Sequence, residues 1–218
     1  AYEIKECDWS SDLCSSDLTS TQATVLTTTE ITGLSTSQLV GLTSTAIAAL
    51  PATIAAALST TQIAALTSTQ VGGINRVEIA AFSLDQIAAL NSTQISGLTA
   101  SGLYGLTATQ AAALTVDQIS GLSSTQVAGL TSTAVAAFTA SQIASLSTTQ
   151  IKGLTAGDLG AMSATELTAL ATTGLAALSA VQLAGVSADQ FDALSADLVA
   201  AFASTALSGL STTQMRSL

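Results

Sequence analysis

The stretch that decides the fold is Leu122-Ser123-Ser124-Thr125-Gln126-Val127-Ala128-Gly129, after which Leu130 starts the same eight-residue pattern again. Stepping by eight from Leu18 to Leu218 gives 26 positions, and twenty of them are Leu. The others are Ile74, Phe82, Phe138, Met162, Val186 and Phe202. Because no insertion or deletion breaks this phase, the length of the chain counts repeats of one short unit and not globular domains.

The octads are numbered here so that the recurrent Leu is position 8, which gives 25 octads from Thr19 to Leu218. Position 1 is Ser or Thr in twenty octads and Asn in two, and position 4 is Gln in fourteen and Glu in three. Ser/Thr-x-x-Gln/Glu is a capping box, in which each side chain accepts a hydrogen bond from the other residue's main-chain N–H. The Leu before the cap and the apolar residue at position 5 stand where a hydrophobic staple requires them. Each octad is therefore predicted to start a helix.

Three octads lack both halves of this capping box. They begin at Pro51, Ala171 and Ala203, and their fourth residues are Ile54, Gly174 and Ala206. This joint loss is what reciprocal bonding predicts, since proline for example has no N–H to donate. In four other octads an Asp at position 3 adds negative charge to the first turn, where the helix dipole favours it: Asp85, Asp117, Asp189 and Asp197.

One continuous helix does not fit the octad. At about 100° per residue, successive Leu residues lie about 80° apart around such a helix, so they form no fixed apolar seam. We therefore predict an all-α solenoid of very short helices, one per octad over residues 19–218, each covering roughly positions 2 to 7. Positions 5 and 8 are expected to face a shared core. Position 7 is Gly, Ala or Ser everywhere except Val25, which indicates close approach of neighbouring backbones and not a need for positive φ.

A β-solenoid with two octads in each 16-residue coil is the alternative fold. Thr-x-Thr triplets such as Thr67-Ser68-Thr69 favour strands. Against it, positions 5 and 8 have opposite parity, so one strand does not bury both. Ala, which strands disfavour, also fills many of positions 2, 6 and 7.

Composition narrows the classes of function. The chain is 3% aromatic and 8% charged, so its core consists of small side chains around Leu and Ile. The net charge is −10, and the four basic residues are scattered along the chain. The sequence therefore lacks the clustered Lys and Arg that a nucleic-acid-binding protein needs. Polar residues interrupt every apolar run before the ~18–20 residues that a membrane helix requires, so no membrane span is predicted.

The first eighteen residues do not follow the repeat. Residues 8–18, Asp-Trp-Ser-Ser-Asp-Leu-Cys-Ser-Ser-Asp-Leu, resemble a translated sequencing adapter, and we interpret residues 1–18 as an artefactual leader joined to a genuine repeat fragment. The alternative is a small secreted cap closed by a Cys7–Cys14 disulfide. The segment has no basic n-region and no apolar h-region, so it is not a signal peptide. Leu218 ends in phase without a polar cap, which predicts that the array is part of a longer protein.

No catalytic, cofactor-binding or metal-binding residue is predicted. The chain has no His, and its two Cys lie in the leader, which removes His-based triads, Cys nucleophiles and most zinc sites. The closest acidic group, Asp189, Asp192 and Asp197, is too dispersed for a calcium loop. Gly102, Gly157 and Gly174 form no phosphate-binding motif and are interpreted as weakened octads. The bulky or charged side chains at the sixth position of an octad are expected on a solvated face: Tyr104, Lys152, Asp192 and Arg216.

The Leu-Thr-x-x-Gln-Ile/Val-x-x-Leu pattern, from about Thr19 onward, is similar to low-complexity arrays in very large bacterial secreted or surface proteins. That resemblance implies a spacer, stalk or adhesive scaffold outside a bacterial cell, with no enzyme activity and no cofactor. Its expected contacts are with a cell surface or with other copies of the chain. The alternative is a module that binds ice or another regular lattice, because Ser124–Gly129 resembles part of the ice-nucleation protein repeat. The Leu at every eighth position departs from that family.

Overall fold

A computed structural model of the chain describes residues 19–217, which contain 25 short α-helices, one in each octad. The chain divides into two compact units, Ala1–Gly105 and Leu106–Leu218. The described part of the first unit holds α1–α11, and the second holds α12–α25. The interpretation of residues 1–18 as a leader lies outside the described residues, and the prediction that the whole array forms one solenoid stays a prediction.

The helices of the first unit are α1 Ser20–Ala23, α2 Thr28–Gly33, α3 Thr36–Val40, α4 Ser44–Ala48, α5 Ala52–Ala55, α6 Thr60–Ala65, α7 Ser68–Val71, α8 Arg76–Ala81, α9 Leu84–Ala88, α10 Ser92–Gly97 and α11 Ala100–Leu103. Those of the second unit are α12 Ala108–Ala113, α13 Val116–Ser120, α14 Ser124–Ala128, α15 Ser132–Val135, α16 Ala140–Ala144, α17 Thr148–Ile151, α18 Ala156–Ala161, α19 Ala164–Ala169, α20 Ala171–Ala176, α21 Ala180–Leu183, α22 Ala188–Asp192, α23 Ala196–Ala200, α24 Ser204–Leu207 and α25 Thr212–Arg216.

The all-α prediction is confirmed, and the β-solenoid alternative is wrong, since residues 19–217 contain no strand. The physical reason is the predicted one, because the core takes its side chains from positions 5 and 8, whose parity differs. In the octad of α9, for example, Ile87 and Leu90 are 1% and 2% exposed.

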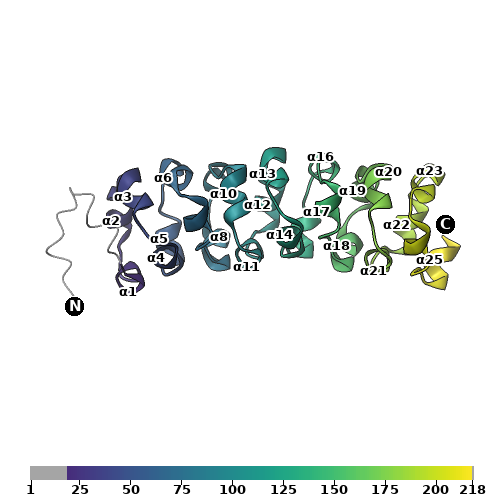
Figure 1. The fold of residues 1–218 in the computed structure, drawn as a ribbon, viewed down its shortest axis with the longest axis horizontal. Helices are drawn as coiled ribbons and strands as arrows, with labels where there is room; N and C mark the ends of the chain where they lie inside the picture. Colours follow the sequence, from purple (N-terminus) through teal and green to yellow (C-terminus); the bar gives the residue numbers. More distant parts are fainter. Residues whose placement is uncertain (1–18, 218) are drawn as a thin grey trace. The chain divides into compact units, whose positions relative to one another are not determined.

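Within each unit a helix packs on the helix three octads later, so one coil consists of three octads and not of two. In the first unit α1 lies beside α4 and α3 beside α6, at opposite edges in Figure 1. In the second unit α12 packs on α15 and α15 on α18. Isolated helices of four to six residues are unstable in water, so this stacking must stabilise them.

Position 7 is small for the expected reason. A Cβ built on Gly97, near the end of α10, would collide with the main-chain carbonyl of Ser68 at the start of α7. No glycine among the described residues has a positive φ, so close packing and not the backbone conformation accounts for Gly97.

The predicted caps are present. All seventeen octads with Gln or Glu at position 4 form the reciprocal capping box, and Thr155 with Asp158 adds an eighteenth that the Gln/Glu pattern did not include. The three octads without a capping residue have no side-chain cap. In one of them α20 starts a residue early, and Ala171 adopts φ 53°, a strained conformation for a residue with a Cβ.

Candidate functional site

The acidic side chains of the described residues are dispersed. No group of three or more His, Cys, Asp or Glu side chains lies together within residues 19–217. Asp189, Asp192 and Asp197 are each exposed on α22 and α23, and Asp189 and Asp197 stand in the first turn of their helices. In the same part of the chain, no helix is long and apolar enough to span a membrane.

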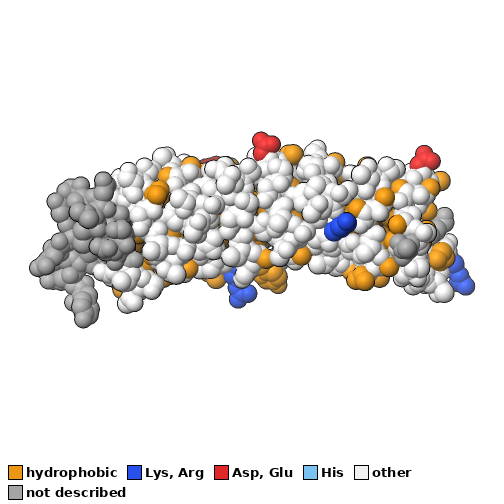
Figure 2. Space-filling view, in the orientation of Figure 1, with side chains coloured by type: hydrophobic (Ala, Val, Ile, Leu, Met, Phe, Trp, Pro, Cys, Tyr) orange, Lys and Arg blue, Asp and Glu red, His pale blue; other side chains and the backbone are white. Residues whose placement is uncertain are grey.

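The large or charged side chains at position 6 lie on the solvated face, as predicted. Tyr104 is 56% exposed, and Lys152, Asp192 and Arg216 are also exposed. On the face drawn in Figure 2 the charged side chains stand singly among uncharged atoms.

The feature that sequence reasoning missed is a second role of the glutamines at position 4. Gln62 accepts the N–H of Ser59 at 2.9 Å through Oε1, which is its part in the capping box. Its Nε2 donates to the carbonyls of Ile31 at 2.8 Å and Leu34 at 3.0 Å, where α2 ends in the coil below. The same amide therefore supplies an acceptor to the start of one helix and a donor to the end of another. We call this arrangement the glutamine clamp.

The clamp recurs in both units with the same register. Nine glutamines donate from Nε2 to the carbonyl of the position 8 residue 28 positions earlier, at 2.6–3.0 Å: Gln62, Gln70, Gln86, Gln94, Gln142, Gln150, Gln182, Gln190 and Gln214. All nine are at most 7% exposed. Since the last carbonyls of a helix have no partner within it, each clamp satisfies groups that burial would otherwise leave unpaired.

The ratio of fourteen Gln to three Glu was the signal for this second role. A capping box accepts either residue, and the helix dipole favours the negatively charged one in the first turn. A strong preference for the amide therefore requires a donor as well as an acceptor, and only Gln carries both.

Glu78 and Asp158 are the two buried carboxylates at position 4, and Glu78 is the longer one. It is 1% exposed, and its Oε2 accepts the N–H of Asn75 at 2.6 Å. Its Oε1 is the one buried side-chain oxygen or nitrogen in the described residues that has no hydrogen-bond partner. Burial raises the pKa of this carboxyl from 4.5 to about 7, although the hydrogen bond from Asn75 acts in the opposite direction.

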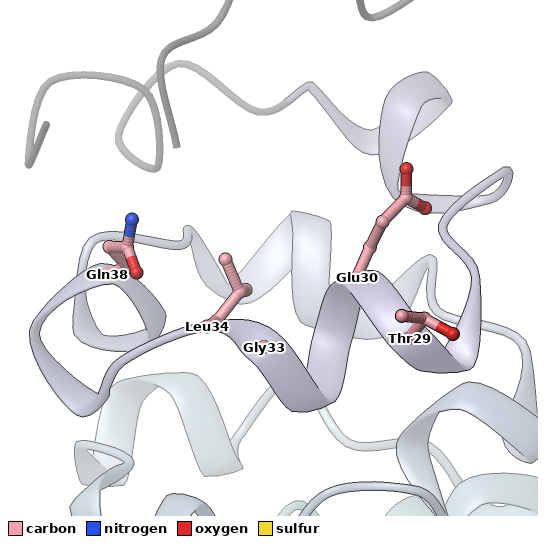
Figure 3. A pocket seen from close by; sticks show the side chains of 5 residues that line it. All are labelled: Thr29, Glu30, Gly33, Leu34 and Gln38. Carbon is pink, nitrogen blue, oxygen red and sulfur yellow. The ribbon is translucent and has the colours of Figure 1, made fainter. Parts of the chain in front are cut away.

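A hollow of about 230 Å³ lies at the corner between α2 and α3, lined by Thr29, Glu30, Gly33, Leu34 and Gln38 (Figure 3). The Glu30 and Gln38 side chains project to the same side of the corner. Glu30 is held by its own cap, because Oε2 accepts from the N–H and the hydroxyl of Thr27, both at 2.8 Å. The hollow thus combines the position 4 side chains of two successive octads.

One side of the first unit carries a regular row of hydroxyl groups. The stacked helices α1, α4, α7 and α10 all have Ser at position 2 and Thr at position 3. Thr21, Thr45, Thr69 and Thr93 are exposed, and the four octads contain no charged residue. We call this surface the hydroxyl row. It is uncharged and polar, and it repeats once in every coil.

Comparison with known proteins adds no family. No protein-family model matches the chain, and no curated protein matches it significantly.

Proposed function

We propose that the chain is a structural repeat region, an extended spacer, stalk or adhesive scaffold of a larger bacterial extracellular protein, without catalytic activity. The glutamine clamp is the observation that carries this proposal. Every clamp joins residues only 28 to 31 positions apart, so each coil depends on its immediate neighbours. Such an array gains length by adding octads and needs no new core, which is how spacers built from repeats are made.

The test adds one coil to the full chain. Residues 139–162, three complete octads, are duplicated in tandem, and small-angle X-ray scattering measures the longest dimension before and after. Stacked helices lie about 8–10 Å apart, so a spacer is expected to lengthen by about that distance while its helicity per residue stays constant. The matched control inserts the same three octads with their residues in scrambled order, which removes the Ser/Thr–Gln spacing and should add an irregular loop. Equal dimensions for the duplicated and the parent chains would contradict the spacer function.

The location is tested separately in cells that carry the gene. An antibody raised against the repeat array should label intact cells as strongly as permeabilised ones. Labelling that appears only after permeabilisation would remove the extracellular part of the proposal and leave the spacer part untouched.

A lattice-binding module is the second candidate, and the hydroxyl row favours it. Four exposed threonines at equivalent positions of successive coils form a repeating array of hydroxyl groups. Ice binding predicts that the chain depresses the freezing point below the melting point and that replacing Thr45, Thr69 and Thr93 by lysine abolishes the effect. Freezing and melting at one temperature in the parent chain would exclude ice as the lattice.

A further inference from the structure

Glu78 occupies position 4 of its octad, where the octads on either side along the chain place the amides of Gln70 and Gln86. Its partner at the cap is the ordinary one, since Oε2 accepts from Asn75 as the Gln Oε1 atoms accept from their own caps. The difference lies at the second oxygen. In the clamps of Gln70 and Gln94, the corresponding atom is an NH₂ group that donates to carbonyls 28 and 31 positions earlier.

For Glu78 the same register leads to the carbonyls of Ile47 and Leu50. Ile47 lies in the last turn of α4, and Leu50 precedes Pro51 at the start of α5. An ionised carboxylate oxygen accepts hydrogen bonds and does not donate them, so it has nothing to offer to two carbonyl oxygens. This explains why Oε1 is buried without a partner.

We propose that Glu78 is a proton-operated latch: its neutral carboxyl donates from Oε1–H to the carbonyl of Ile47 or Leu50, and its ionised carboxylate releases that corner. The proton comes from solvent and returns to it, with no other reactant. A metal ion suits the position poorly. One carboxylate and two carbonyls supply far fewer oxygens than the six to eight that Ca²⁺ takes.

No neighbouring charge competes with this assignment. Of the elements packed against α8, α5 and α11 contain no titratable residue, and neither does α4 beneath Glu78. The nearest titratable groups along the chain, Arg76 and Asp85, are exposed on α8 and α9, and Tyr104 after α11 is 56% exposed. Desolvation therefore dominates, in agreement with a pKa of about 7.

The corner that the latch holds is weak for a separate reason. Helix α5 begins at Pro51 without a side-chain cap, so it lacks the stabilisation that a capping box gives most of its neighbours. The folded state binds the Glu78 proton more tightly than the unfolded chain, whose glutamate has its ordinary pKa of 4.5. The stabilisation is thus fully present below pH 4.5 and is lost as the pH rises through about 7. The hydrogen bond of the latch is therefore formed in acid and lost above neutral pH. The latch proposal does not depend on the proposed spacer function.

The experiment compares the full chain with Glu78→Gln, which keeps the acceptor and supplies a permanent donor. Urea unfolding followed by circular dichroism gives the unfolding equilibrium constant at pH 4 and pH 8. The ratio of the parent constant to the Glu78→Gln constant should rise about 200-fold between these pH values, as a pKa shift from 4.5 to about 7 requires. The matched control is Glu166→Gln, at the same position of an octad in the second unit, where the carboxylate is half-buried and already in a capping box. Its ratio should show no comparable rise, because that side chain is not fully buried.

Direct titration supplies a second readout. The side-chain carboxyl carbon of Glu78, assigned by its loss in Glu78→Gln, should titrate by NMR with a midpoint near 7. A midpoint near 4.5, or a parent-to-variant ratio that does not change with pH, would overturn the proposal. Stabilisation of the parent chain at pH 8 by CaCl₂, absent in Glu78→Gln, would also overturn it by assigning Oε1 to a metal ion.

Discussion

Replacing Gln150 by alanine removes one complete clamp from the second unit. The side chain is 4% exposed and lies at the start of α17. Its Oε1 accepts from the N–H and the hydroxyl of Ser147, both at 2.9 Å. Its Nε2 donates to the carbonyls of Ile119 at 2.6 Å and Leu122 at 2.9 Å. The substitution leaves the Ser147 N–H and the Leu122 carbonyl without the Gln150 partner and removes one of two hydrogen bonds to the Ile119 carbonyl, which still accepts the N–H of Leu122 at 3.0 Å. Alanine keeps the helix propensity high.

The expected loss follows from these groups. A hydrogen bond contributes about 1 kcal/mol net, and a buried group left unpaired costs about 1–3 kcal/mol, so two unpaired main-chain groups and one further lost hydrogen bond amount to roughly 3 kcal/mol. The matched control is Gln22→Ala in the first octad. Gln22 is exposed, and among residues 19–217 it forms only the capping box, so its loss is expected to cost about 0.5–1 kcal/mol. The difference between the two variants isolates the clamp from the cap.

Two measurements check this difference. Urea unfolding followed by circular dichroism gives the free energy for the whole chain. Because repeat arrays need not unfold in one step, hydrogen exchange with mass spectrometry should show where the loss occurs. Faster exchange in Gln150→Ala is expected at residues 147–154 and also at residues 119–122 of the preceding coil. Equal costs for the two variants, or faster exchange confined to α17, would refute the clamp as a stabilising contact between coils.

The sequence alone was sufficient for the local architecture. Ser or Thr at position 1 with Gln or Glu at position 4 marks the start of each helix, and the absence of both at Pro51, Ala171 and Ala203 marks the uncapped ones. These interactions join residues three apart, so the pattern records them directly. Burial of positions 5 and 8 followed from the same phase.

The contacts between coils could not be read in the same way. Every octad of a coil carries the same pattern, so the eight-residue period does not indicate whether two, three or four octads complete one turn of the solenoid. The clamp joins residues 28 and 31 positions apart, and only the excess of Gln over Glu pointed to it. The burial of Glu78 depended in turn on knowing the clamp. The early start of α20, with Ala171 at φ 53°, also had no local signal beyond the missing cap.

Four further substitutions, in three tests, separate the roles of charge, packing and backbone strain. Gln150→Glu should be tolerated at pH 4 and destabilised at pH 8, because an ionised carboxylate keeps the cap but loses the donor; unfolding by urea at both pH values checks this, and equal stability at both would contradict it. Gly97→Ala should cost about 1–3 kcal/mol because its Cβ meets the Ser68 carbonyl, whereas Gly33→Ala at the same octad position has open space and should gain about 0.5–1 kcal/mol. Thermal unfolding of both variants measures these changes in stability. A loss of stability in Gly33→Ala as large as that in Gly97→Ala would contradict close packing at Gly97. Ala171→Gly relieves a positive φ and should raise the unfolding temperature by about 2–4 °C in calorimetry, while a lower temperature would show that φ is not the cause.

The clamp also explains how helices of four to six residues persist at all. A helix this short has more groups without an intrahelical partner at its two ends than it has internal hydrogen bonds, so each end needs partners from elsewhere. The amide of Gln serves an N-terminal N–H and C-terminal carbonyls of different helices at once, and it does so without charge. A carboxylate at that position serves the first group only, and it becomes equivalent only by taking up a proton. Substituting Glu for Gln therefore converts a permanent contact between coils into one that depends on pH. In the first unit, Glu78 is the fully buried position 4 residue that is Glu and not Gln.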